Sequence, residues 1–192
     1  ALKRDSKPER QAEQSLAALK LRKPLFEAGF VYKQTYALAD ILNPVGKDAW
    51  DLFEVKSSTG IKDVYYADAA FQKYCYEGAG IKIRKVYLVY INNEYVKNGP
   101  IDPAALFIQD EITKEVEGLA GDVEDQIDRM IDIIKQKECP NIKIGVHCND
   151  PYECALQDIC WDFLPEESVF ILNGFHKKKA FELIDSGVTH IK

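Results

Sequence analysis

Residues 25–56 read LFEAGFVYKQTYALADILNPVGKDAWDLFEVK, and this stretch determines the fold class that we expect. Two apolar runs, 25–31 and 36–42, are separated by a short polar turn. A third run occupies 50–56, after a loop over 43–49 that contains Asn, Pro and Gly. A continuous apolar run at 86–92 is typical of a strand buried on both faces. The pattern therefore predicts at least four strands, three of them consecutive along the chain.

Helical patterns surround these strands. We expect helices over 8–23, over 66–77 with its end at Gly78 and Gly80, over 110–137 with a break at Gly118 and Gly121, and over 177–186. Residues 139–165 predict loops, and residues 168–172 a short strand. Strands followed by a helix and another buried strand indicate an α/β fold, a mixed sheet flanked by helices. We expect residues 1–138 to form the core and the Cys-rich segment 139–192 to pack on it, as one domain.

Composition excludes several classes of protein. The 192 residues are 46% hydrophobic and 29% charged, which is not the composition of a disordered or collagenous chain. No apolar run reaches the roughly 18 residues of a membrane span, and the first residues show no signal peptide. We therefore expect a cytoplasmic protein without a membrane partner.

The net charge of −6 argues against a nucleic-acid partner, but the charge is unevenly distributed. Residues 110–138 contain ten acidic and four basic residues, whereas residues 1–23 contain seven basic and three acidic ones. Net charge therefore does not exclude a local DNA-binding groove. The basic runs at 82–85 and 176–179 are candidate phosphate contacts, or simply solvated surface.

Three charged residues lie inside otherwise apolar strands. Glu54 and Lys56 are two residues apart, so they point to the same face. Asp40 meets Glu54 if the second and third strands are neighbours. Two carboxylates beside an ammonium group form the minimal apparatus of metal-dependent phosphodiester hydrolysis, in which the carboxylates hold Mg²⁺ or Mn²⁺. The alternative is a surface strand with a cross-strand ion pair.

Three further polar residues lie near this constellation in the sequence. Gln72 and Tyr76 share one face of the next predicted helix. They could hold a phosphate, a water or the lysine, or instead belong to a buried helix face. Glu27, on the first strand, is a candidate additional carboxylate at the metal or an ordinary exposed side chain.

The order of these motifs resembles the PD-(D/E)xK nuclease superfamily, especially its RecB-like branch. Asp40 is followed by Glu54-Val55-Lys56 and then by Gln72-x-x-x-Tyr76, as in that branch. The whole chain is most similar to a bacterial family related to the CRISPR-associated RecB-type exonucleases. That similarity extends over the stretches 26–28, 39–42, 54–59, 71–72, 147–148, 150–154 and 160–161.

The resemblance implies a restriction-endonuclease-like core that acts on DNA with Mg²⁺ or Mn²⁺. It implies Asp40 and Glu54 as metal ligands, the Val55 carbonyl as a further ligand, and Lys56 as the catalytic lysine. The superfamily's Pro-Asp is Ala39-Asp40 here. The branch also has a metal-ligating His on an upstream helix, whereas the first His of this chain is His147. Either Glu13 or Gln14 substitutes for it, or the residue lies upstream in a longer protein with further domains.

The chain contains five cysteines, and four of them lie within 22 residues: Cys139, Cys148, Cys154 and Cys160. Cys75 stands alone in a helical pattern, and we expect it in the core. Clustered thiolates bind Zn²⁺ or an iron–sulfur cluster. The resemblance implies a [4Fe–4S] cluster with Cys139 or an upstream cysteine as fourth ligand. A Cys3His zinc site with His147, and reduced thiols without a metal, are the alternatives.

Three hypotheses follow. The first is a metal-dependent, exonuclease-like DNA nuclease that works in DNA repair, processing or defence. The second is a catalytically weak nuclease-fold module that binds DNA or a protein, with the cysteine site as a structural staple. The third is a metabolic zinc or iron–sulfur protein. Whether Asp40 and Glu54 come together discriminates the third from the other two.

Overall fold

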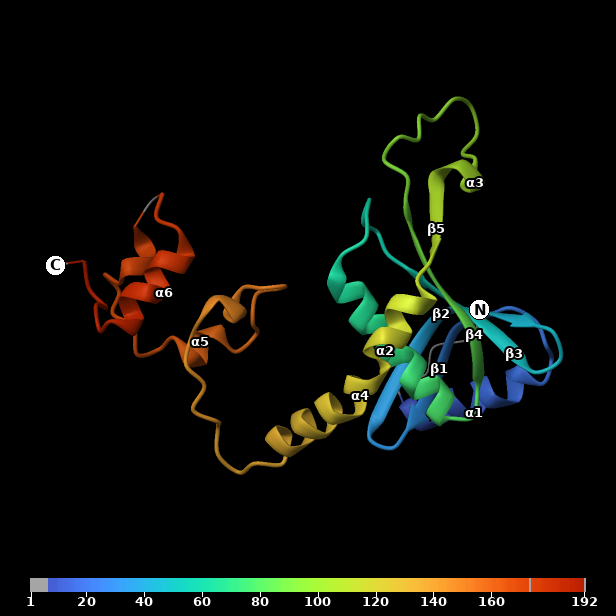
Figure 1. Ribbon diagram of the computed structural model, residues 1–192, viewed down its shortest axis with the longest axis horizontal. Helices are drawn as coiled ribbons and strands as arrows, with labels where there is room; N and C mark the ends of the chain where they lie inside the picture. Colours follow the sequence, from blue (N-terminus) through green and yellow to red (C-terminus); the bar gives the residue numbers. More distant parts are fainter. Residues whose placement is uncertain (1–6, 173, 192) are drawn as a thin grey trace. The chain divides into compact units, whose positions relative to one another are not determined.

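The computed structural model describes residues 7–172 and 174–191. The chain divides into two compact units, residues 1–131 and 132–192. The first unit contains a five-stranded mixed sheet flanked by helices (Figure 1), so the expected α/β fold with a mixed sheet is confirmed. The division falls inside a helix rather than after residue 138. The expected packing of the second part on the first stays a prediction.

The first unit comprises these elements: α1 Pro8–Leu19, β1 Leu25–Tyr32, β2 Thr35–Val45, β3 Ala49–Val55, α2 Asp63–Gly78, β4 Lys82–Ile91, α3 Pro103–Leu106, β5 Phe107–Glu111 and α4 Thr113–Ile134. The strands lie in the order β1-β2-β3-β4-β5. The β3–β4 pair is parallel and the other pairs are antiparallel. Parallel neighbours need a long crossover, which here is α2. This crossover places α2 directly after the strand that carries Glu54.

The predicted loop 43–49 is wrong in its first half. β2 continues through Asn43 and Pro44 to Val45, and Pro44 pairs with Trp50. Proline is tolerated there because β1 begins at Leu25, opposite Leu42, so that residues 43–45 have a strand partner only on the β3 side. A tight turn with Gly46 at φ 57° then leads into β3.

The predicted helix 110–137 was wrong at its start. Residues 107–111 form β5, which pairs with β4 from Tyr87 to Ile91, and Figure 1 shows this β-ribbon reaching past the rest of the sheet to α3. The helix begins at Thr113 and runs unbroken through Gly118 and Gly121 to Ile134. Burial of Val116 and Val123 on the apolar stripe stabilises the helix and compensates for the low helix propensity of the two exposed glycines. The predicted helix 8–23 ends at Leu19.

The core of the first unit lies between the sheet and α2. Tyr76 packs edge-on against Phe30 of β1, with ring centroids 5.5 Å apart. Cys75 is fully buried beside them, and its Sγ lies 3.3 Å from the Phe30 carbonyl. The prediction that Cys75 is a core residue is therefore confirmed.

The second unit has a small core of its own. Ile144, Cys148 and Phe181 are buried there, with Trp161 and Phe170 packed around Phe181. Its helices are α5 Gln157–Cys160 and α6 Lys177–Asp185, and α6 confirms the predicted terminal helix. The predicted strand 168–172 is wrong. Val169–Ile171 form a 3-10 turn instead, and Ser168 makes only an isolated bridge with His190. No helix in the described part of the chain is long and apolar enough to cross a membrane.

Candidate active site

The pairing of β2 with β3 brings Asp40 and Glu54 to facing positions. Ile41 pairs with Phe53, so Asp40 and Glu54 occupy the next position along the two antiparallel strands. Asp40 Oδ2 accepts a hydrogen bond of 2.7 Å from the Val55 backbone N–H. The two acidic residues predicted from sequence are therefore neighbours, which is the arrangement that a shared cation requires.

Glu54 is a buried carboxylate whose two oxygens are held by different elements. Oε1 accepts a hydrogen bond of 2.7 Å from Lys56 Nζ, and Oε2 accepts one of 2.8 Å from Gln72 Nε2 on α2. Burial raises the pKa of Glu54; the hydrogen bonds from Lys56 and Gln72 oppose this shift, and the charge of Asp40 adds to it. A second cation placed beside Glu54 would relieve this cost.

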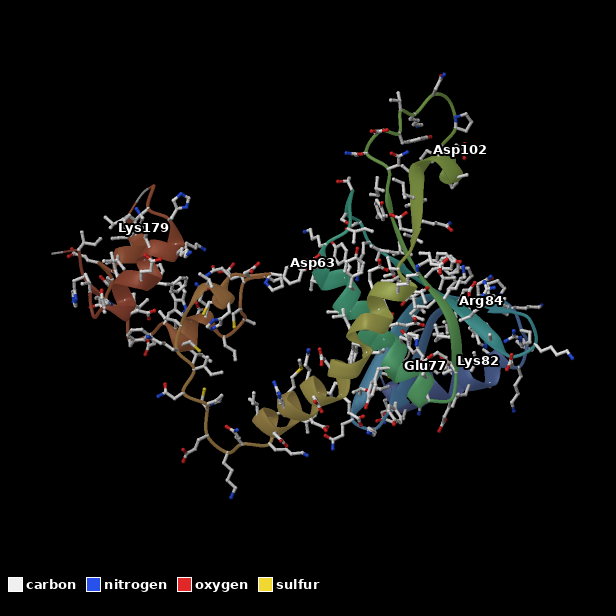
Figure 2. The ribbon with its side chains drawn as sticks, viewed as in Figure 1. Asp63, Glu77, Lys82, Arg84, Asp102 and Lys179 are labelled. Atoms are coloured by element: carbon white, nitrogen blue, oxygen red, sulfur yellow. The ribbon has the colours of Figure 1, made fainter. Side chains whose placement is uncertain are left out.

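One face of α2 supplies the polar partners of β3. Asp68, Gln72 and Tyr76 follow one another at intervals of four residues, between Asp63 and Glu77, which Figure 2 labels near the two ends of the helix. The Tyr76 hydroxyl donates a hydrogen bond of 3.0 Å to Gln72 Oε1. Burial raises the pKa of Tyr76 well above its ordinary value, so the phenol stays protonated. Tyr76 thereby turns the amide donor of Gln72 toward Glu54.

Lys56 is enclosed by two carboxylates and an aromatic ring. Its Nζ lies 2.7 Å from Glu54 Oε1 and 2.5 Å from Asp68 Oδ2, and 5.3 Å from the centre of the Tyr65 ring. Burial by itself lowers the pKa of Lys56, but the hydrogen bonds to Asp68 and Glu54 outweigh it and raise the pKa. Lys56 is therefore a permanent cation rather than a proton acceptor. The ion pair lowers the pKa of Glu54 by less than burial raises it, because Glu54 is more buried than Lys56 and shares this one cation with Asp68.

Asp68 is the member of this cluster that sequence reasoning missed. An isolated acid on a helix usually faces solvent, and nothing in its immediate neighbours distinguishes it. The available signal was its spacing, since Asp68 lies four residues before Gln72 on the face already assigned to the site.

Glu27 and Val55 lie beside the two carboxylates. Phe26 pairs with Ile41 and Ala28 with Ala39, so Glu27 stands opposite Asp40, in a left-handed conformation with φ 57°. Irregularities of this kind next to active sites redirect side chains. The Glu27 side chain makes no hydrogen bond or ion pair within the described residues, so its predicted role at the metal stays a prediction. So does that of the Val55 carbonyl.

The α1 residue that reaches this irregular position is Gln11. Its Nε2 donates a hydrogen bond of 2.8 Å to the Glu27 carbonyl, and Gln11 is fully buried. Glu13 and Gln14, which the sequence suggested as substitutes for a missing histidine, are exposed. Gln11 is thus better placed than either of them to act on this end of the site.

Among the described residues, no group of three His, Cys, Asp or Glu side chains is arranged to hold a metal ion. Cys148 and Cys160 both contact the small core of the second unit, whereas Cys139 and Cys154 are exposed. The backbone N–H of Cys154 donates to the Cys148 carbonyl, but the thiols of the four cysteines do not form one cluster. The [4Fe–4S] and zinc hypotheses stay predictions.

The basic residues of 82–85 lie on β4 and pair with acidic residues of neighbouring segments. Lys82 bonds to Asp48, Arg84 to Asp51 and Lys85 to Glu111, and Figure 2 labels Lys82 and Arg84 on this strand. Their charge is therefore largely compensated within the first unit. In the second unit, Lys177 donates to Asn149 Oδ1.

Comparison with known proteins adds little. No protein-family model matches the chain, and no curated protein matches it. A solved structure titled "Crystal structure of SSO0001" is 14% identical, with a TM-score of 0.27. The similarity covers 67% of this chain and 61% of that one, so the chain spans less than two thirds of the length of that protein. A TM-score this low supports no conclusion about fold or activity.

Proposed function

We propose that the chain is a metal-dependent DNA nuclease that hydrolyses phosphodiester bonds. The observation that carries the proposal is the placement of three residues side by side: Asp40 on β2, Glu54 near the end of β3, and Lys56 directly after β3. Helix α2 closes over Glu54 with Gln72 and Tyr76, the two residues that the RecB-like motif pattern contains at this point. DNA as substrate, and exonuclease-like cleavage, rest on that resemblance in motif order.

The donor set fits a hard divalent cation. Mg²⁺ binds through one or two carboxylates and keeps several waters, so a pair of neighbouring carboxylates is sufficient. Asp40 and Glu54 would hold the ion, with the Val55 carbonyl beside them. Burial and the charge of Asp40 make the ionised form of Glu54 costly, and a cation at this point compensates that cost. When bound, Mg²⁺ or Mn²⁺ supplies a water of lowered pKa and a positive charge for the phosphate.

Lys56 acts through its charge. Because its pKa is raised, it does not accept a proton from the attacking water at neutral pH. Its ammonium group instead donates hydrogen bonds toward the scissile phosphate or the water, where negative charge develops in the transition state. Gln72 and Tyr76 keep Glu54 in place on the other side of the carboxylate.

The Cys-rich segment has a separate proposed role. By the resemblance alone, Cys148, Cys154 and Cys160, with Cys139 or an upstream cysteine, would hold a [4Fe–4S] cluster, with Zn²⁺ as the less favoured occupant; the four thiols do not lie together in this structure. Such a site would act as a staple within the second unit, apart from the hydrolytic chemistry.

The test is degradation of end-labelled single- and double-stranded DNA with Mn²⁺ or Mg²⁺, by wild type, Lys56→Ala and Lys73→Ala. Lys73 is a matched control, because it also pairs with a carboxylate (Glu77, 2.9 Å) but lies outside the Glu54 cluster. We expect metal-dependent degradation that Lys56→Ala lowers to a small but measurable residual rate and that Lys73→Ala retains. Equal activity in all three would place the activity elsewhere. DNA binding without cleavage in wild type would favour a catalytically weak module.

A further inference from the structure

We propose that Asp68 is a positioning residue, which fixes the direction of the Lys56 ammonium group for the reaction. The inference rests on the proposed nuclease function and adds to it a residue that the motif pattern does not contain. Its basis is the short contact of 2.5 Å between Asp68 Oδ2 and Lys56 Nζ. Asp68 lies on α2, the helix whose Gln72 also donates a hydrogen bond to Glu54.

The geometry of an ammonium group explains what Asp68 contributes. Lys56 has three N–H donors on one tetrahedral nitrogen. Glu54 takes one and Asp68 takes another. One contact alone would leave the group free to rotate about that hydrogen bond, whereas two contacts fix the direction of the third donor. Among the described residues no hydrogen-bond acceptor takes that third donor, so it is available to a phosphate or a water.

Asp68 is held by the same helix that holds Glu54 through Gln72. Asp68 lies within α2, one turn before Gln72, and Gln72 bonds to the other oxygen of Glu54. One helix therefore holds both functional side chains at the end of β3. A lysine side chain has four rotatable bonds and loses much conformational freedom when it is fixed. Fixing it before the substrate arrives removes that cost from the reaction.

A purely structural role for Asp68 is a poor explanation of the contact. The Asp68 side chain is 40% exposed, and ion pairs with an exposed partner contribute little to stability because water screens them. The loss of Asp68 should therefore be visible in turnover and hardly at all in folding.

The test compares turnover of Asp68→Ala, Asp68→Asn, Lys56→Ala and the double variant Lys56→Ala/Asp68→Ala on DNA with Mn²⁺. Glu77→Gln is the matched control, because it removes another paired carboxylate of α2 that does not touch Lys56. We expect Asp68→Ala to lower kcat about tenfold, with KM changed less than about threefold. Asp68→Asn, which keeps an acceptor, should fall between Asp68→Ala and wild type. In the Lys56→Ala background the loss of Asp68 should have no further effect.

The proposal is overturned if Asp68→Ala leaves kcat unchanged or raises it, or if its effect is the same in the Lys56→Ala background. Carbon relaxation of the Lys56 side chain, measured by NMR on lysine-labelled protein, separates this result from failure of the nuclease function. A wild type without nuclease activity, but with a rigid Lys56 that becomes mobile in Asp68→Ala, refutes the nuclease and supports the positioning. An equally mobile Lys56 in both proteins refutes the positioning whatever the activity.

Discussion

Replacing Tyr76 with Phe removes one hydroxyl and tests whether the buried chain from Tyr76 through Gln72 to Glu54 is a working hydrogen-bond network. Tyr76 is 0% exposed and Gln72 is 6% exposed, and 3.0 Å separates the hydroxyl from Gln72 Oε1. The ring contact with Phe30 is unchanged in the variant, so the hydrophobic contribution stays the same. The loss is that of a buried acceptor left without a partner, about 1–3 kcal/mol of unfolding free energy.

The assay is urea unfolding followed by Trp50 fluorescence in a Trp161→Phe background. The two tryptophans lie in different units, so this background reports on the first unit alone. Tyr87→Phe is the control, because the Tyr87 ring stacks on Phe53 and its hydroxyl makes no hydrogen bond within the described residues. If Tyr76→Phe costs no more than Tyr87→Phe, the network does not hold Gln72, and the orientation of its amide has another cause.

Three further substitutions test stability. We expect two of them to leave the free energy of unfolding unchanged or to raise it, and one to lower it. Glu54→Gln should abolish activity and leave stability unchanged or higher, with a larger gain at pH 7.5 than at pH 5. The reason is that the pKa of Glu54 is raised in the folded state, so the ionised side chain destabilises the wild type as pH rises above about 4.5. A stability difference between variant and wild type that is smaller at pH 7.5 than at pH 5 would contradict this. Gly78→Ala should lower the urea midpoint, because a Cβ would lie 2.2 Å from the Tyr32 ring, at a cost of about 1–3 kcal/mol. Gly118→Ala, in an open position of α4, should raise the free energy of unfolding by about 0.5–1 kcal/mol. A stabilised Gly78→Ala variant would show that helix propensity, and not the contact with Tyr32, decides at that position.

The strand residues of the site could be predicted because strand geometry is local. The period of two places Glu54 and Lys56 on one face, and the tight turn after Val45 makes β2 and β3 neighbours. Helical spacing likewise placed Gln72 and Tyr76 together. Asp68 was not predicted as a site residue, because an acidic residue on a helix surface is common. Only the position of Lys56 in space gives Asp68 a partner.

The errors have physical causes of the same kind. Residues 107–111 contain Gln, Asp and Glu and continue into a helical pattern, so their pairing with β4 depends on a partner that the local sequence does not reveal. The short apolar run at 168–172 fits a strand, but Val169–Ile171 form a 3-10 turn in which Phe170 packs against Phe181 in the small core. Cysteine spacing gave the density of thiols along the chain without their positions in space.

Binding of Mn²⁺, followed by the loss of the free-ion signal in electron paramagnetic resonance, decides most directly whether Asp40 and Glu54 together hold one divalent cation. We expect wild type and Glu77→Gln to bind one ion in this site, and Asp40→Asn and Glu54→Gln each to lose it. Equal binding by all four proteins, or no binding by wild type, would show that the two carboxylates are not a metal centre.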